Sequence, residues 1–232
     1  MLKIDFLQTN FESKRTISLN QWVLLIVGYL ILNIIISNVV MHGEPIPIAS
    51  ILNSLIFLFT FILIFKKFGV DFKNTWNMWK KSFNRDFALC FLVSIILVPL
   101  ELLMVHFNLT GTLLKHHSVE MTNALNELIS KTNYLGLFLW FFSLGILTPI
   151  VEEIFFRRLL YVALRHQYNF KRSIVFGSLI FALFHPGALL LTFITSFVCY
   201  YLYERFQRLS LTIFLHSFNN LVILSISIYR LS

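Results

Sequence analysis

Two adjacent glutamates, Glu152 and Glu153, lie inside a long apolar run and are candidates for chemistry. Ionisable groups are costly inside a bilayer, so those that occur there are usually paired or functional. Glu153 and Arg157 are four residues apart, so in a helix they share a face and can form an ion pair. Glu152 points about 100° away from that face and has no such partner. The spacing therefore predicts one structural glutamate, Glu153, and one chemical glutamate, Glu152, which could act as a general base.

Three further polar residues lie in two other apolar runs. His185 ends one run, and His216 with Asn220 lies on one face of the last run. We place the inner membrane boundary at the arginines near these runs and count about 1.5 Å per helical residue. Measured from that boundary, Glu152 and His185 lie roughly 20 Å deep. His216 then lies roughly 12 Å deep and Asn220 roughly 18 Å. We therefore predict that these four side chains line one water-filled cavity.

Each of these side chains also has a purely structural interpretation. A lone histidine in a membrane helix is often a hydrogen-bonded packing residue, and an asparagine often joins two helices. A glutamate and an arginine can form a buried structural pair. No single one of these residues indicates a functional site. Their combination at similar depth in the membrane does favour one.

The elements that carry these residues must lie in lipid. The chain has 232 residues, of which 57% are hydrophobic and 13% charged. A soluble domain averages about 45–50% apolar and about 25% charged residues. We therefore predict an all-α, polytopic membrane protein that forms a single domain over residues 1–232.

Seven apolar segments are candidates for membrane-spanning helices, which need about 20 residues. The fifth and sixth are short and meet at Pro186 and Gly187, so we expect a helical hairpin there; the alternative is one broken helix. The predicted segments are residues 21–41, 48–65, 87–106, 134–164, 173–185, 189–203 and 211–229.

The distribution of basic residues predicts the orientation. The net charge of +8 would suggest nucleic acid on a soluble protein, but here the basic residues lie between apolar runs. With the N-terminus inside, only Lys115, Lys131 and Arg230 of the 19 lysines and arginines fall outside. This asymmetry favours the predicted layout and excludes nucleic acid as a partner.

Two connecting segments, residues 71–85 and 118–131, are predicted to be interfacial helices. The first places Phe72, Trp76, Trp79 and Phe83 on one helical face, with lysines beside them. This pattern is typical of an amphipathic helix at a membrane surface. We interpret it as an anchor, with a substrate-docking surface as the alternative.

Three motifs resemble the series that characterises the CAAX protease and bacteriocin-processing family, also called the Abi family. They are Glu152-Glu153-x-x-x-Arg157, Phe181-x-x-x-His185 and His216-x-x-x-Asn220. The resemblance covers about residues 146–224, which we call the catalytic motif region. In one departure from the family, residues 192–203 contain no glycine before the last motif.

The resemblance implies a membrane-embedded endopeptidase of the glutamate type. By this resemblance, Glu152 activates a water molecule and His185 helps to hold and deprotonate that water. His216 and Asn220 stabilise the oxyanion, a role often worth a few kcal/mol per donor. The predicted ion pair of Glu153 and Arg157 maintains the structure of the site.

The resemblance requires no cofactor, because a glutamate and a histidine can activate water without a metal. Two histidines and a glutamate are also the ligands of catalytic zinc sites. If a divalent metal such as zinc is bound, its ligands are therefore Glu152, His185 and His216.

We hypothesise an intramembrane endopeptidase whose substrate is a peptide or a segment of a membrane protein. Some relatives serve bacteriocin maturation or self-immunity, so a non-catalytic immunity or scaffold protein of the same family is the alternative. A small transporter is disfavoured, because the chain shows no internal repeat. We expect a multi-pass protein of the bacterial cytoplasmic membrane, because the lysine-, asparagine-, isoleucine- and phenylalanine-rich composition suggests an AT-rich genome.

Overall fold

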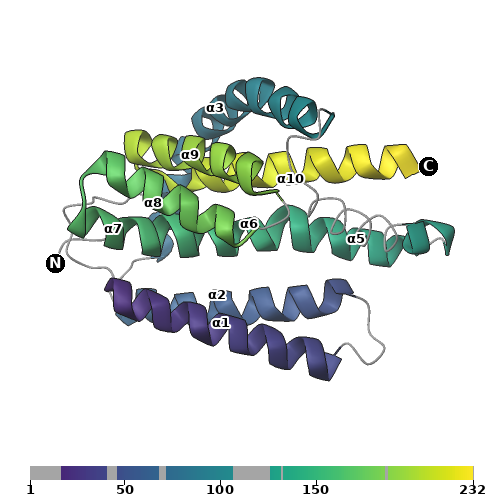
Figure 1. Ribbon diagram of the computed structural model, residues 1–232, viewed down its shortest axis with the longest axis horizontal. Helices are drawn as coiled ribbons and strands as arrows, with labels where there is room; N and C mark the ends of the chain where they lie inside the picture. The colour runs from purple at the N-terminus through teal and green to yellow at the C-terminus, as the bar shows by residue number, and fades with distance from the viewer. Residues whose placement is uncertain are drawn as a thin grey trace.

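The computed structural model describes residues 17–40, 46–67, 72–106, 126–131, 133–185 and 188–231. Within these ranges the elements are helices, most of which run roughly along the long axis of the molecule (Figure 1), as predicted for an all-α fold. Their bounds are α1 Leu19–Val40, α2 Ile46–Lys67, α3 Phe72–His106, α5 Tyr134–Phe142, η1 Ser143–Leu147, α6 Thr148–Glu152, η2 Glu153–Tyr161, α7 Val162–Gln167, α8 Phe170–Leu183, α9 Leu189–Phe206 and α10 Leu209–Leu231.

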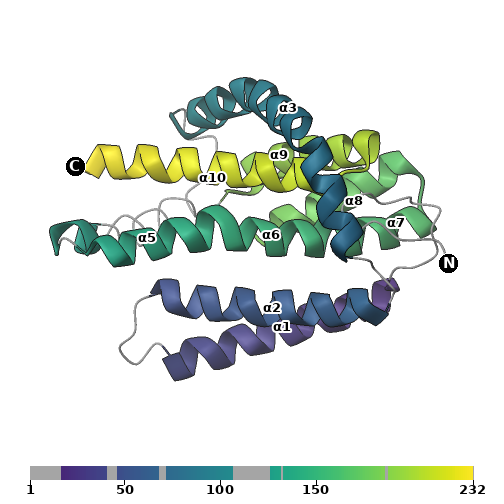
Figure 2. The same cartoon turned by 180° about the vertical axis from the view of Figure 1, so that it is seen from behind.

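The elements α5 to α7 follow one another as a single long helix, which occupies the middle of the molecule. Figures 1 and 2 show α1 and α2 on one side of this central helix, and α8, α9 and α10 on the other. Two stretches of it, η1 and η2, are π-helical, a geometry that is frequent at functional sites. The central helix therefore contacts both layers and carries the first motif between them.

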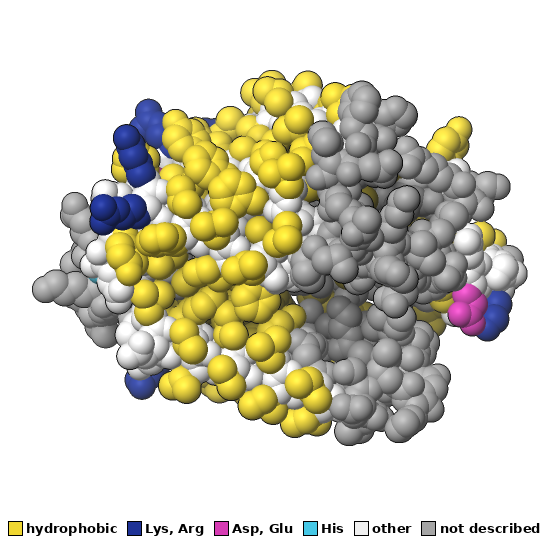
Figure 3. Space-filling view, in the orientation of Figure 1, with side chains coloured by type: hydrophobic (Ala, Val, Ile, Leu, Met, Phe, Trp, Pro, Cys, Tyr) yellow, Lys and Arg dark blue, Asp and Glu magenta, His cyan; other side chains and the backbone are white. Residues whose placement is uncertain are grey.

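Three stretches of the described chain are long and apolar enough to cross a membrane. They are Trp79–Met104, Tyr134–Gln167 and Leu209–Ile226. In Figure 3, hydrophobic side chains cover the middle of the visible surface, while lysines and arginines gather toward one end. These features indicate a membrane protein. The count of seven spans and the inside location of the N-terminus stay predictions.

The predicted boundary between an interfacial helix and the third span is wrong. Residues 72–106 form the continuous helix α3, which bends along its course (Figure 2). The rings of Trp79 and Phe83 lie 6.0 and 5.3 Å from the ring of Phe214 in α10. Part of the aromatic face thus packs against α10, which the amphipathic pattern alone did not indicate. Of the second predicted interfacial helix, residues 126–130 are helical, and residues 118–125 lie outside the described residues.

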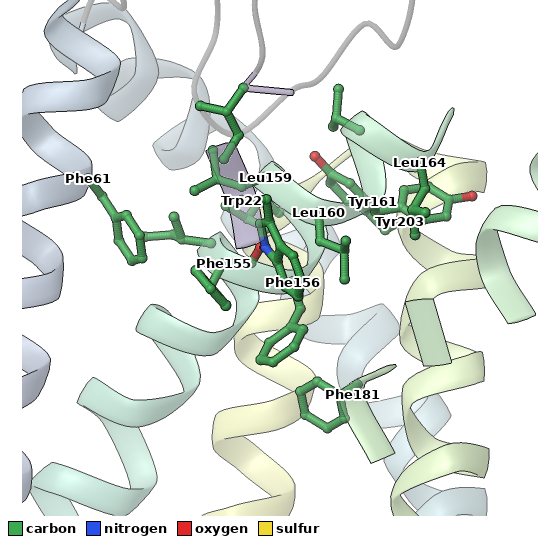
Figure 4. Packing of buried hydrophobic residues seen from close by; sticks show 14 of the residues in the cluster. Trp22, Phe61, Phe155, Phe156, Leu159, Leu160, Tyr161, Leu164, Phe181 and Tyr203 are labelled. Atoms are coloured by element: carbon green, nitrogen blue, oxygen red, sulfur yellow. The ribbon is translucent and has the colours of Figure 1, made fainter. Parts of the chain in front are cut away.

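The main hydrophobic core surrounds η2. All nine residues of η2 are buried, as expected for a helix enclosed on every side. Figure 4 shows Trp22, Phe61 and Phe155 on one side of this core and Phe181 on another. The indole nitrogen of Trp22 donates to the Phe155 carbonyl over 3.2 Å, and the Tyr200 hydroxyl donates to the Phe156 carbonyl over 3.3 Å. These bonds tie η2 to α1 and α9, and so hold the first motif in place.

The predicted hairpin is confirmed, since α8 and α9 are separate helices that pack together. The residues of its predicted turn, 186 and 187, lie outside the described residues. Close packing comes from Gly177 in α8, where an added Cβ would lie 2.7 Å from the Tyr200 ring. A glycine on the neighbouring helix therefore allows the close approach, although residues 192–203 of α9 lack one.

Gly177→Ala is expected to destabilise the protein by about 1–3 kcal/mol, because the Tyr200 ring is fully buried and has little room to move. The matched control is Gly28→Ala, because a Cβ at Gly28 meets nothing within 4 Å. Both changes gain the same helix propensity, so the difference between them isolates the clash. The measurement is the apparent Tm of each purified variant in detergent, and equal Tm values would contradict the packing argument.

Candidate active site

The predicted site residues converge although they come from three separate parts of the chain. Glu152 ends α6, His185 follows α8, and His216 lies in α10. One oxygen of the Glu152 carboxyl group lies 3.8 Å from Nε2 of His185. The other oxygen lies 3.7 Å from Nε2 of His216. Glu152 therefore stands between the two histidines.

The predicted ion pair of Glu153 and Arg157 is confirmed. A guanidinium nitrogen of Arg157 lies 3.0 Å from Glu153 Oε1, and the two side chains are only 1% and 0% exposed. The guanidinium also lies over the rings of Phe181 and Tyr200, at 4.3 and 4.6 Å from their centroids. It donates a further hydrogen bond to Ser196 over 3.1 Å. Arg157 thus connects the central helix to both α8 and α9.

Glu153 also orients His216. Its Oε1 lies 2.9 Å from Nδ1 of His216, and an ionised carboxylate can only accept a hydrogen bond. Nδ1 of His216 therefore carries a proton, and Nε2 is turned toward Glu152. A carboxylate that holds one imidazole nitrogen while the other faces the reacting atoms is a recurring catalytic arrangement.

His185 is oriented by its own helix. Its Nδ1 lies 2.9 Å from the carbonyl oxygen of Phe181, which can only accept. A neutral His185 therefore has its lone pair on Nε2, the nitrogen that faces Glu152. The imidazole also stacks on the Phe181 ring at 4.6 Å, which limits its rotation.

A cavity of about 330 Å³ opens beside these residues. Glu152, His185, His216 and Asn220 all line it, which agrees with the cavity predicted from their depths. One hydrogen of the Asn220 amide is used in a 2.9 Å bond to the Leu144 carbonyl, so the amide nitrogen has a second hydrogen to donate.

A second cavity, of about 240 Å³, also borders Glu152 and His185. Its other walls are apolar and include Tyr29 and Phe57 from α1 and α2. Glu152 and His185 therefore lie between a cavity with several polar groups and one that is mainly apolar.

Glu101 and Asn219 line the first cavity but were not among the predicted site residues. Asn219 precedes the site residue Asn220 and bonds to α3, donating to Glu101 over 3.4 Å. Glu101 comes from α3 and is 95% buried, with an exposed fraction of 5%. The available signal was the presence of a carboxyl group inside the third apolar segment.

The residues that could hold a metal are the ones named from the sequence, Glu152, His185 and His216. Over the described ranges, no group of three histidine, cysteine, aspartate or glutamate side chains is arranged to hold a metal ion. The two cysteines, Cys90 and Cys199, are buried and free, as expected of small apolar residues.

Comparison with known protein families matches the segment that carries the three motifs. Residues 134–222 match the family described as type II CAAX prenyl endopeptidase Rce1-like. The matched segment includes the three motifs, so the predicted resemblance is confirmed and a peptidase is supported. No curated protein matches the chain, and no solved structure does.

Proposed function

Because residues 134–222 are similar to a family of peptidases, we propose that the chain is an intramembrane endopeptidase of the glutamate type. Its substrate is a peptide or a segment of a membrane protein. One observation carries the proposal: the two oxygens of Glu152 face Nε2 of His185 and Nε2 of His216 at the wall of a cavity. The proposed enzyme lies in the bilayer as a multi-pass protein, with its N-terminus inside.

Glu152 and His185 activate the attacking water in this proposal. Their 3.8 Å separation is longer than a direct hydrogen bond, so neither group satisfies the other. A water molecule that bridges the two groups can lose its proton to Glu152 or to the free lone pair of His185. The resulting hydroxide attacks the peptide carbonyl, and no metal is required for this step.

His216 and Asn220 stabilise the oxyanion that forms. A protonated His216 presents an N–H at Nε2, and the Asn220 amide has a hydrogen left to donate. Glu153 accepts a hydrogen bond from Nδ1 of His216 and so keeps Nε2 turned toward the site. The negative charges of Glu152 and Glu153 are then balanced by Arg157 and His216, which limits the cost of burying them.

The apolar second cavity suits an apolar part of the substrate. It borders the same two catalytic residues and is lined mainly by aromatic and aliphatic side chains. Its position is consistent with a substrate segment that comes from the lipid phase. We propose that an apolar substrate residue next to the scissile bond occupies it.

The test compares peptide N-termini and secreted peptides from cells that produce wild type or His185→Ala. Among the described residues, the His185 side chain hydrogen-bonds to the Phe181 carbonyl of the preceding helix and faces Glu152, so its loss removes chemistry with little structural change. We expect specific cleavage products of the wild type to vanish in the variant, at equal protein levels in the membrane. The matched control is His166→Ala, because His166 is an exposed histidine at the end of α7.

The products also identify the substrate and the cleaved bond. Identical product profiles from wild type and His185→Ala would contradict the proposed reaction. Loss of products in both histidine variants would point to a general loss of the protein and not to the role of His185.

A further inference from the structure

A second carboxyl group, that of Glu101, lines the polar cavity beside Glu152. It belongs to α3, outside the segment that matches the peptidase family. Its side chain is 95% buried, since the exposed fraction is 5%. The cavity therefore has one carboxyl group from the central helix and one from α3.

A chain of hydrogen bonds holds Glu101 by one oxygen only. Ser94 donates to the amide oxygen of Asn219 over 3.3 Å, and the amide nitrogen of Asn219 donates to Glu101 Oε1 over 3.4 Å. The other oxygen, Oε2, is buried and has no hydrogen-bond partner among the described residues. The hydrogen bond from Asn219 to Oε1 thus fixes the Glu101 side chain, while Oε2 is left without a partner among the described residues.

A role in helix association explains this arrangement poorly. A carboxyl group that only joined α3 to α10 would be expected to use both oxygens, because a buried polar atom without a partner costs about 1–3 kcal/mol. The His216 imidazole lines the same cavity as Glu101 but is already paired with Glu153, and an ionised carboxylate without a cation of its own is costly inside a bilayer. A protonated carboxyl group that meets a substrate atom accounts for both facts.

The hydrolysis of an amide requires a proton donor at the departing nitrogen. Glu152 and His185 take a proton from water, and His216 with Asn220 donate to the oxyanion. We propose that Glu101 is a further catalytic residue, which contacts the nitrogen of the scissile bond and gives it a proton. This inference rests on the proposed endopeptidase function.

The step balances in atoms and charge. As the tetrahedral intermediate collapses, the carbon–nitrogen bond breaks and its electron pair stays on nitrogen. The nitrogen takes the proton of Glu101, so the amine leaves neutral and Glu101 becomes a carboxylate. The proton that Glu152 and His185 took from water then returns to Glu101 through water in the cavity. The net reaction is one peptide bond and one water molecule giving one acid and one amine.

The test uses the cleaved sequence identified above, synthesised as the normal amide and as a thioester at the scissile bond. A thiolate leaves without a proton near neutral pH, since a thiol has a pKa of about 8.5. The variant is Glu101→Gln, which keeps the size of the side chain and an oxygen that can accept from Asn219. Both substrates are compared for wild type and variant in the same vesicles.

We expect Glu101→Gln to cleave the amide about 100-fold or more slowly, and the thioester within about threefold of wild type. An equal loss on both substrates would show a structural role and overturn the proposal. Unchanged cleavage of the amide would overturn it as well. If the wild type cleaves neither substrate, the proposed endopeptidase function itself fails.

A second variant keeps the test decisive if Glu101→Gln does not reach the membrane. Glu101→Asp retains an acid that is one methylene shorter, so the amide reaction should slow while the thioester reaction stays near wild type. Parallel losses on the two substrates in this variant would overturn the proposal in the same way.

Discussion

Glu152→Gln is expected to lower kcat for peptide hydrolysis by about 10³- to 10⁴-fold, near the upper end of general-base effects. The amide of glutamine has nearly the shape of the carboxyl group, but it cannot accept a proton from water. The stability of the fold should change little. Glu152 Oε2 has no hydrogen-bond partner among the described residues, so removal of the charge leaves no donor without its acceptor.

The measurement is a single-turnover assay with protein reconstituted in vesicles, using the substrate found in cells. The matched control is Glu127→Gln, since Glu127 is an exposed glutamate paired with Lys131 at 2.6 Å. The control should retain wild-type activity. A Glu152→Gln variant that keeps its biological effect while the peptide profile is unchanged would support the non-catalytic immunity or scaffold function instead.

Arg157→Met is expected to destabilise the protein by about 3–5 kcal/mol, the largest stability effect that we predict. The change leaves the fully buried carboxylate of Glu153 with His216 as its remaining charged partner. It also removes the guanidinium that packs over Phe181 and Tyr200. The measurement is the apparent Tm in detergent, together with the fraction of folded protein recovered from membranes.

Two further variants separate the buried charge from a general effect of losing an arginine. The double variant Glu153→Gln with Arg157→Met should recover much of the lost stability, because the buried carboxylate of Glu153 is then removed together with its partner. Arg165→Met should lower the stability of the protein by less, on the order of 1 kcal/mol. The side chains of Arg165 and its partner Glu204 are 23% and 21% exposed, so water screens their ion pair. Equal losses in Arg157→Met and Arg165→Met would contradict the importance that we assign to burial.

Local sequence patterns predicted the helices and the ion pair. Six of the seven predicted apolar segments coincide with described helices to within a few residues at each end, whereas the third begins 15 residues after the start of α3 at Phe72. The spacing of Glu153 and Arg157 predicted their contact, since residues four apart are neighbours on any helix. It also predicted that Glu152 would face elsewhere. These inferences succeeded because they depend on one helix at a time.

Patterns within one helix did not predict how the helices meet. The amphipathic face of residues 72–83 was expected at the membrane surface, but part of it packs against Phe214. Glu101 was overlooked as a site residue, although a carboxyl group in an apolar segment was a visible signal. Its approach to Asn219, a residue 118 positions further along the chain, depends on how α3 crosses α10.

From the residues alone we could determine that the chain is helical and apolar enough for lipid, and which polar residues were candidates for chemistry. Hydropathy and helical spacing are local properties, so they can be read without knowing the neighbours. Tertiary packing decided which nitrogen of His216 faces Glu152 and which carboxyl groups share the cavity. Those facts depend on distances between helices that are far apart in sequence, and side-chain volumes such as that of Tyr200 against Gly177 set these distances.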